Sequence, residues 1–456
     1  MPLRLLTVCL AAAGIVLVFW FAVRLIGLLR VATGLTSHTL CSAVFVSGLD
    51  PASVHEQTLA PIAGMGLVRW ALSYEVERER REVRAGFLGQ FASRAVFRPG
   101  LGCRVLRGND SVPDEAPPMP STPAFKSEAT QIAHPRLAAA LDRVFASAGP
   151  VYGWTTAVVV VKDGRIAAER YAPGVTPNTP LLGWSATKSV TSALIGILVR
   201  QNRLAIGQRA AVTEWRDPAD PRHAITVEHL LQMRSGLNIP ETHSGFDPVS
   251  HMLYIERDMG AFAARARLRA QPGVEWRYTS GNTLILCRLI RDLVGGRASD
   301  VLRFAHAELF EPLGMHTPVL EFDATGTPIG STYLFASARD WARFGELYLQ
   351  DGVISGRRIL PEGWVRYSST PTPGTNYAAG FWTAQPQWGL PPDAFLARGF
   401  LGQAVVIVPS ERLVLTRFGA FHRAGRELET LGPLLREAIA ALRASTSSGG
   451  RDLVRI

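Results

Sequence analysis

The fold of this 456-residue chain is decided by the stretch Trp184-Ser185-Ala186-Thr187-Lys188-Ser189, which opens an apolar run that continues to Val199. The run predicts a helix that begins at Ser185. Side chains three residues apart lie on one face of a helix, so the Ser185 hydroxyl and the Lys188 amine are expected to meet. The helix N-terminus adds free N–H groups and positive potential near the serine oxygen. Ser-x-x-Lys therefore predicts a nucleophilic serine with an amine beside it.

A lysine at this position is unusual for the chain, because Lys188 is one of only three lysines among 48 basic residues. A desolvated lysine can lose its proton near neutral pH and accept the serine proton, whereas an arginine cannot. The motif alone leaves open a surface lysine without a catalytic role. The rival serine motif, Gly-x-Ser-x-Gly, is incomplete here, because Thr187 replaces its second glycine.

Composition excludes several classes of protein. Hydrophobic residues make up 47% of the chain and charged residues 19%, which excludes a largely disordered chain. The net charge is +10, but the arginines form no long basic run interleaved with aromatics, so no nucleic-acid partner is expected. There is no phosphate-binding loop, and Gly100-Leu101-Gly102 lacks the third glycine of a dinucleotide fingerprint. No histidine pair has metal-site spacing, so neither a cofactor nor a metal is expected.

The N-terminus predicts a membrane span. Leu5 to Val23 is an uncharged run of 19 residues, close to the length that crosses a bilayer as a helix. A cleaved signal peptide is the alternative, because Arg4 followed by an apolar run fits that pattern as well. No Ala-x-Ala cleavage site follows the run, and Arg24 lies just past it. We therefore expect an uncleaved anchor that binds the membrane through residues 5–23.

The orientation of this anchor rests on two opposed signals. Arg24 and Arg30 follow the span while only Arg4 precedes it, which by the positive-inside rule favours a cytoplasmic main domain. Cys41 and Cys103 favour export, because a disulfide between them would form only in an oxidising compartment. The alternative is two unrelated buried thiols. We expect a single-pass protein of the inner (cytoplasmic) membrane whose catalytic domain is periplasmic.

Composition also predicts the domain boundaries. Five prolines crowd the stretch from Ser111 to Pro123, which cannot hold regular structure. The predicted segments are an anchor or uncleaved signal (1–30), a membrane-proximal segment stapled by the disulfide (31–105), a Pro-rich linker (106–125), a catalytic domain (126–445) and a flexible tail (446–456).

Residue patterns within the catalytic domain predict an α+β fold. Residues 155–171 have the pattern of a β-hairpin, with Asp163-Gly164 as its tight turn. Residues 404–408 and 413–418 predict two further strands, and helical spacing occurs at 135–148 and 428–442. Strands that lie at both ends of the domain, with helices between them, predict an antiparallel sheet flanked by helices.

Several segments in order resemble one family. The nucleophile stretch resembles that of the serine β-lactamase and penicillin-binding-protein superfamily, in particular its class C-like branch of esterases and 6-aminohexanoate-dimer hydrolases. Three more segments are similar to that branch: Ile225 to Leu237, Leu309 to Met315 and Ser337 to Gly345. The resemblance covers about 126–443 and implies a β-lactamase-like fold, an antiparallel sheet flanked by helices with a helical subdomain.

The resemblance also implies roles for two residues of a second motif. The family's Tyr-x-Asn is similar to Tyr278-Thr279-Ser280 here. Tyr278 takes the tyrosine position, whose phenol would relay a proton between the nucleophile and the leaving group. The alternative for Tyr278 is a structural tyrosine beside a turn. Ser280 takes the asparagine position and could hold a substrate carbonyl or the Lys188 amine.

The family's third motif, Lys-Thr-Gly, has no good match. Its place is taken by Ala397-Arg398-Gly399-Phe400. Gly399 would let the substrate approach the strand edge, and the backbone N–H groups of Phe400 and Ser185 would form the oxyanion hole. The missing lysine puts recognition of a β-lactam carboxylate in doubt. Arg398 is either a partial substitute in substrate binding or a surface strand residue.

These features together predict a membrane-anchored serine hydrolase that cleaves a small ester, amide or peptide-like substrate through an acyl-enzyme at Ser185. The first alternative is a penicillin-recognising D-Ala-D-Ala carboxypeptidase or a class C-like β-lactamase. The second is a non-catalytic sensor or cell-wall-binding module that kept the fold.

Overall fold

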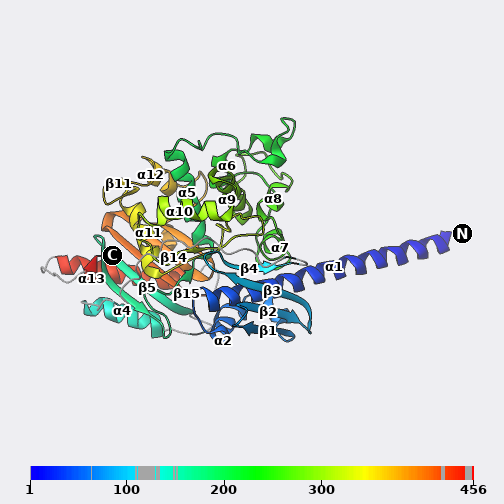
Figure 1. The fold of residues 1–456 in the computed structure, drawn as a ribbon, viewed down its shortest axis with the longest axis horizontal. Helices are drawn as coiled ribbons and strands as arrows, with labels where there is room; N and C mark the ends of the chain where they lie inside the picture. The colour runs from blue at the N-terminus through cyan, green and yellow to red at the C-terminus, as the bar shows by residue number, and fades with distance from the viewer. Residues whose placement is uncertain are drawn as a thin grey trace.

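A computed structural model describes residues 2–62, 64–107, 110, 129, 134–146, 149, 153–422, 427–446 and 454–455. Figure 1 shows a globular body from which one long helix, α1 (Pro2–Phe45), projects at the N-terminus. The part of α1 from Ala12 onward is long and apolar enough to cross a membrane. Most of the predicted linker (106–125) lies outside the described residues.

The body is organised around a seven-stranded antiparallel sheet. Its strand order is β12-β13-β14-β15-β5-β6-β16. The strands are β12 (Trp382–Thr383), β13 (Phe395–Gly399), β14 (Gln403–Val408), β15 (Leu413–Ala420), β5 (Trp154–Lys162), β6 (Arg165–Tyr171) and β16 (Val454–Arg455). The predicted hairpin is present as β5 and β6, with left-handed backbone at Asp163 and Gly164. Two residues of the predicted flexible tail are paired here as the edge strand β16.

Helices cover both faces of this sheet. On one face, α4 (Pro135–Ala146) and α13 (Glu427–Thr446) pack on alternate side chains of the strands, such as Val158 and Val160. On the other face lie α11 (Ala338–Leu349) and α5 (Thr187–Arg200), which begins after a 3-10 turn at Trp184–Ala186. Strand residues alternate between the two faces, so one sheet supports two separate apolar cores. The predicted α+β fold is confirmed.

A helical subdomain stands beside the sheet, as the resemblance implied. Its helices are α6 (Val227–Leu231), α7 (Pro248–Tyr254), α8 (Met259–Ala264), α9 (Ser280–Val294) and α10 (Ala298–Ala305), followed by a π-helix at His306–Phe310. Smaller elements complete the domain: β7 (Leu181–Leu182), β8 (Val319–Leu320), β9 (Leu334–Ala336), β10 (Val353–Ile354), β11 (Arg357–Arg358) and α12 (Trp364–Ser369).

The membrane-proximal segment is built into the body. Helix α1 does not end at the predicted boundary of residue 30 but continues to Phe45, and its residues from Leu28 onward are largely buried. A four-stranded antiparallel sheet packs against it, preceded by two short helices and a π-helix at His55–Leu59. These elements are α2 (Pro51–Val54), α3 (Met65–Val68), β1 (Leu72–Glu77), β2 (Glu82–Phe87), β3 (Gln90–Arg98) and β4 (Gly102–Leu106).

One buried carboxylate ties α1 and β4 to the catalytic domain. Glu321 is fully buried, and its Oε1 accepts hydrogen bonds from the Ser42 hydroxyl and the Cys103 N–H, both at 2.8 Å. Its Oε2 lies 2.9 Å from His38 Nε2. Three elements distant in sequence therefore meet at a single side chain.

The structure pairs Cys41 of α1 with Cys103 of β4 in a disulfide that closes a separation of 62 residues. A cross-link of this length restricts the unfolded chain, and such bonds typically contribute about 3 kcal/mol. We expect Cys103→Ala to lower the free energy of unfolding by about that amount, measured by denaturant unfolding of the detergent-solubilised protein. Reductant should destabilise the wild type equally and leave the variant unchanged. Unfolding of the wild type that is insensitive to reductant would contradict this prediction.

Candidate active site

Ser185 and Lys188 meet as the sequence predicts. Ser185 lies in the 3-10 turn that leads into α5, and Lys188 lies in the first turn of that helix. The Lys188 Nζ is 2.9 Å from the Ser185 Oγ. The contact needs only the local helical geometry, which is why sequence spacing could find it.

The amine of Lys188 has three neighbours at hydrogen-bond distance. Besides Ser185, its Nζ lies 3.0 Å from the Ser280 Oγ and 3.0 Å from the Ser331 carbonyl oxygen. Burial disfavours the charged amine and lowers the pKa of Lys188 to about 8, although the carboxylate of Glu241 opposes the shift. At pH 7 about a tenth of this amine is therefore neutral, with two N–H groups to donate and one lone pair to accept.

Tyr278 lies beside this pair, immediately before α9. The Lys188 Nζ is 4.9 Å from the centre of its ring. Burial raises the pKa of Tyr278 far above its ordinary value, while a hydrogen bond with Ser185 opposes the shift. Tyr278 is thus a neutral phenol at physiological pH and can donate a proton but not act as a phenolate. Its ring packs against Tyr377 and Trp382, at centroid distances of 5.5 and 5.3 Å.

Ser280 and Glu241 extend the site. The Ser280 hydroxyl donates to Glu241 Oε1 at 3.2 Å and lies toward Lys188, so its position fits holding the amine. Glu241 also accepts the Ser280 N–H. Sequence reasoning missed Glu241 and the Ser331 carbonyl. The only signal for Glu241 is its place shortly after the family-like segment that ends at Leu237.

The end of β13 lies against the 3-10 turn that holds Ser185. A Cβ on Gly399 would come within 2.1 Å of the Gly183 carbonyl oxygen, so only glycine permits this approach. Trp184 and Leu401 both have left-handed backbone, at φ 47° and 59°, a conformation that non-glycine residues rarely adopt. They flank Ser185 and Phe400, the residues whose N–H groups are predicted to form the oxyanion hole. Backbone strain of this kind typically occurs at functional sites.

Arg398 is half-buried and lies at the same edge of the sheet. Its guanidinium lies 5.6 Å from the ring centre of Trp382 and 5.8 Å from that of Trp388. Burial lowers its pKa from the usual arginine value. Through Trp382 it is connected to Tyr278, so of the two alternatives weighed for Arg398, the environment favours a residue of the site over a surface strand residue.

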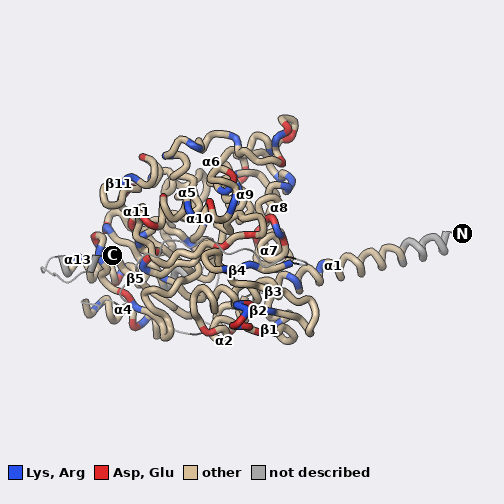
Figure 2. The backbone as a smooth tube through the Cα atoms, viewed as in Figure 1, with Lys and Arg blue, Asp and Glu red and all other residues tan. Residues whose placement is uncertain are grey.

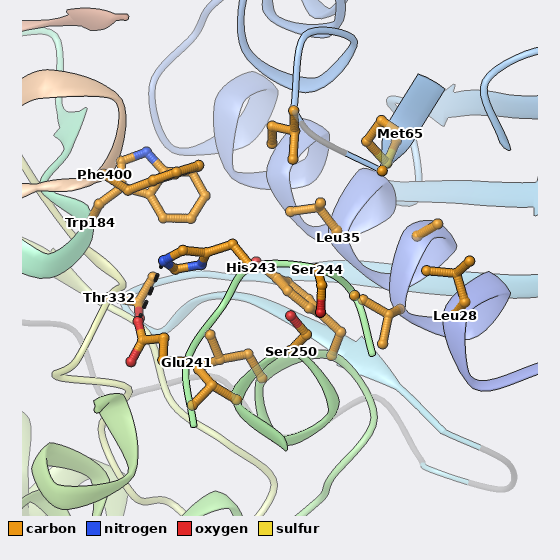
Figure 3. A pocket seen from close by; sticks show the side chains of 18 of the residues that line it. Leu28, Leu35, Met65, Trp184, Glu241, His243, Ser244, Ser250, Thr332 and Phe400 are labelled. Carbon is orange, nitrogen blue, oxygen red and sulfur yellow. Dashed lines mark ion pairs between the residues drawn. The ribbon is translucent and has the colours of Figure 1, made fainter. Parts of the chain in front are cut away.

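A cavity leads to Ser185. Figure 3 shows Trp184, Phe400 and His243 gathered at one end and Leu28 of α1 at the other. The His243 ring stacks on Phe400, with centroids 4.8 Å apart, and its Nε2 lies 3.8 Å from Glu241 Oε1. Ser185 lines the polar end of this cavity.

The part of the chain that holds this site matches a protein-family model. The family model described as Beta-lactamase matches residues 154–429, more than half of the chain. The chain belongs to the β-lactamase family. The predicted superfamily resemblance is thereby confirmed, and the family places the chain among hydrolases of the serine β-lactamase fold.

Curated relatives of this β-lactamase-family chain are hydrolases. The 6-aminohexanoate-dimer hydrolase of Paenarthrobacter ureafaciens is 26% identical over 226 residues, which cover 46% of this chain and 56% of that protein. The unguisins hydrolase of Aspergillus campestris is 26% identical over 180 residues, which cover 36% and 32%. The chain thus spans about half or less of the length of these relatives.

Solved structures show the same fold. A protein of Bacillus anthracis described as a 6-aminohexanoate-dimer hydrolase matches with a TM-score of 0.58 at 22% identity, covering 71% of this chain and 89% of that one. A penicillin-binding-protein homologue from Caulobacter crescentus matches with a TM-score of 0.52 at 18% identity, covering 68% and 100%.

Proposed function

We propose that this protein is a membrane-anchored serine hydrolase that cleaves esters or amides through an acyl-enzyme at Ser185. The observation that carries the proposal is the environment of the Lys188 amine. Its two N–H groups have acceptors in the Ser280 hydroxyl and the Ser331 carbonyl, which leaves the nitrogen lone pair for the Ser185 proton. A neutral lysine held in this way is a general base aimed at the nucleophile.

The reaction follows from this geometry. Lys188 takes the hydroxyl proton as the Ser185 Oγ attacks the carbonyl carbon, and the N–H groups of Ser185 and Phe400 stabilise the resulting oxyanion. Tyr278, a neutral phenol, donates a proton to the leaving alcohol or amine and recovers one from Lys188. Water then attacks the acyl-enzyme with the same groups acting in reverse, and a carboxylic acid leaves. Gly399 admits the substrate at the strand edge, and Arg398 contacts its leaving-group side.

The test uses the full-length protein in detergent. Incubation with a fluorophosphonate probe should add one adduct to the intact mass, and nitrophenyl acetate should be turned over. Ser185→Ala should lose both the adduct and the turnover while keeping its circular dichroism spectrum. A folded wild type that is neither labelled nor active would overturn the proposal. Stable acylation by a fluorescent penicillin would instead support a D-Ala-D-Ala carboxypeptidase or a β-lactamase.

The pH dependence should report the Lys188 pKa of about 8. Below that pH the amine is protonated and cannot act as a base, so kcat/KM should fall about tenfold per pH unit on the acid side. Glu241 raises the Lys188 pKa, so Glu241→Gln should move this limb to lower pH. The relative rate at pH 6.5 should rise about threefold for every half pH unit that the limb moves.

The control for this prediction is Asp292→Asn, which removes an exposed carboxylate of α9 that is paired with Arg291 at the surface. Its profile should match that of the wild type. An acid limb that is the same in Glu241→Gln and the wild type would contradict the assignment of Lys188 as the base.

The membrane topology belongs to the same proposal. Helix α1 anchors the protein in the inner (cytoplasmic) membrane, and the catalytic domain lies on the periplasmic side. The exposed apolar stretch of α1 and the Cys41–Cys103 disulfide support this, since disulfides persist in oxidising compartments. A C-terminal alkaline phosphatase fusion should be active, and a green fluorescent protein fusion should be dark. The reverse pattern would place the domain in the cytoplasm.

A further inference from the structure

The cavity that ends at Ser185 has one wall made by the anchor helix itself. Leu28, Val31, Ala32 and Leu35 line it, and their spacing places them on one face of α1. From Leu28 to Leu35 this wall is about 10 Å long. These residues were predicted to divide between an anchor (1–30) and a membrane-proximal segment (31–105), whereas in the structure they together line the cavity at Ser185.

The opposite walls are also apolar toward the far end. Ile62, Met65 and Val68 contribute from the region of α3, and Val249 and Leu253 contribute from α7. Figure 3 shows Leu35 and Met65 between the nucleophile end and Leu28. Glu241, His243 and Thr332 lie toward the end with Trp184 and Phe400, whereas Ser244 and Ser250 lie midway along the cavity (Figure 3). Apart from these two hydroxyls, the walls toward Leu28 are largely apolar.

The far end of the cavity lies where α1 leaves the body. Leu28 is buried at 7% exposure, while Leu25, three residues earlier, is 41% exposed and begins the apolar stretch that faces outward. Figure 2 shows that the described part of this projecting stretch is almost free of charged residues, with blue positions close to the body. Leu28 lies five residues, or about 8 Å along the helix, beyond Val23, the last residue of the predicted span.

Large apolar side chains are exposed in or beside α3, β2, β3 and α7, which all pack against α1. We call them the apolar rim: Leu67, Trp70, Leu88, Phe91 and Phe246. Two of them adjoin cavity-lining residues in sequence, since Leu67 precedes Val68 and Phe246 follows Gly245. Clusters of exposed apolar residues of this size mark contact surfaces, and tryptophan is favoured at the membrane interface.

The level of the rim along α1 can be fixed by contacts. The Thr33 Oγ1 lies 2.8 Å from the Ser93 Oγ, and Cys41 is bonded to Cys103, which pairs with Phe97 in the sheet. From Thr33 to Cys41, α1 rises about 12 Å, and β3 covers about the same distance from Ser93 to Phe97. The helix and the strand therefore run in the same direction, side by side.

The same alignment, continued toward the N-terminus, gives the position of the β2–β3 turn along α1. Gly89 lies four residues before Ser93, which corresponds to about nine residues of α1 and reaches the level of Arg24. Leu88 and Phe91, which flank this turn, are exposed at 63% and 40%. Leu88 and Phe91, the two rim residues beside this turn, therefore lie near the level of Arg24, where the uncharged run of α1 ends.

We propose that the substrate is an acyl ester or amide of an amphiphile resident in the bilayer, whose acyl chain enters through the apolar rim and fills the cavity lined by α1. The proposal rests on the serine hydrolase function proposed above and names its substrate class. An extended chain advances about 1.2 Å per bond, so the α1 wall alone accommodates about eight carbons.

The orientation of the substrate follows from what lies on each side of Ser185: the cavity on one side, and Tyr278 and Arg398 on the other. The cavity holds the acyl chain, while Tyr278 and Arg398, which are not among the described residues that line it, lie on the leaving-group side. Ser185 Oγ forms a bond to the acyl carbon, and the carbon–oxygen or carbon–nitrogen bond to the head group breaks. The head group leaves with a proton from Tyr278, and water releases the fatty acid.

The test compares acyl chain lengths with the full-length protein in nanodiscs. For the wild type, kcat/KM for nitrophenyl decanoate should exceed that for the acetate ester at least tenfold. Ala32→Trp fills the cavity and should lower this decanoate-to-acetate ratio at least tenfold. Ala22→Trp, the same substitution on a lipid-exposed position of α1, is the matched control and should keep the wild-type ratio. A flat ratio in the wild type, or an unchanged one in Ala32→Trp, overturns the proposal.

A second measurement needs no variant. A long-chain alkyl fluorophosphonate should label wild-type Ser185 at least tenfold faster than an ethyl fluorophosphonate, and equal rates overturn the inference. Dioleoylglycerol placed in the same nanodisc as the enzyme should be hydrolysed, whereas glyceride in separate nanodiscs should not, which distinguishes bilayer from free substrate. Equal hydrolysis from both sources overturns entry from the bilayer. Acetate turnover with Ser185 labelling but no chain-length preference defeats only this inference, while loss of all labelling and turnover defeats the proposed function as well.

Discussion

Lys188→Met is expected to lower kcat for nitrophenyl ester hydrolysis by about 10³-fold or more, since it removes the proposed general base, which lies 2.9 Å from the Ser185 Oγ. Methionine fills a similar volume and leaves no buried charge, so the fold should persist. Lys188→Arg should be as inactive, because a guanidinium cannot give up its proton at any working pH. The measurement is kcat with circular dichroism as a check on folding.

Lys162→Met is the matched control for this experiment. Lys162 is at the end of β5 and donates to the Glu411 carbonyl oxygen, far from Ser185 in the fold. Its removal should leave kcat unchanged. Activity that survives in Lys188→Arg would contradict the base role and would indicate that only a positive charge is needed beside Ser185.

Glu321→Ala is expected to have the largest effect on stability. It would leave the Ser42 hydroxyl, the Cys103 N–H and the His38 imidazole without their common buried partner. Breaking a buried polar cluster by removing one member costs about 4 kcal/mol. Guanidinium unfolding in detergent, followed by tryptophan fluorescence, measures the loss.

Two variants separate the contributions to this effect. Glu321→Gln keeps an oxygen for Ser42 and Cys103 and should lose much less stability than the alanine variant. Glu437→Ala removes a carboxylate paired with Arg136 at the surface, and it should change the unfolding midpoint little. Equal midpoints for Glu321→Ala and the wild type would show that α1 and β4 are held to the catalytic domain without this carboxylate.

Local chemistry made a large part of the fold predictable. The β5–β6 hairpin follows from Asp163-Gly164 between alternating strands, and the Ser185–Lys188 contact follows from three-residue spacing in a helix. The strands at 404–408 and 413–418 were found because short apolar runs are bounded by clear turn residues. Each of these signals lies within about 20 residues of sequence, where backbone geometry alone fixes which side chains meet.

The C-terminal boundary of α1 could not be predicted from local sequence patterns. The apolar run predicted a span, but the sequence offered no sign that the helix continues to Phe45 or that its buried half packs on β3. A helix that is apolar on all sides can face lipid along one part of its length and protein along another. Which part faces lipid and which faces protein depends on the elements that pack against the helix.

The sequence by itself determined that this chain carries a Ser-x-x-Lys motif at the start of a helix, in an α+β fold behind an apolar N-terminal helix. Only the tertiary structure decided what surrounds Ser185 and Lys188. Ser280 and Ser331 reach the Lys188 amine from 92 and 143 residues away. It also decided that α1 forms a wall of the cavity at Ser185. The physical reason is that hydrogen bonds within a helix depend on spacing along the chain, whereas contacts between elements depend on how whole surfaces pack, which no local pattern records.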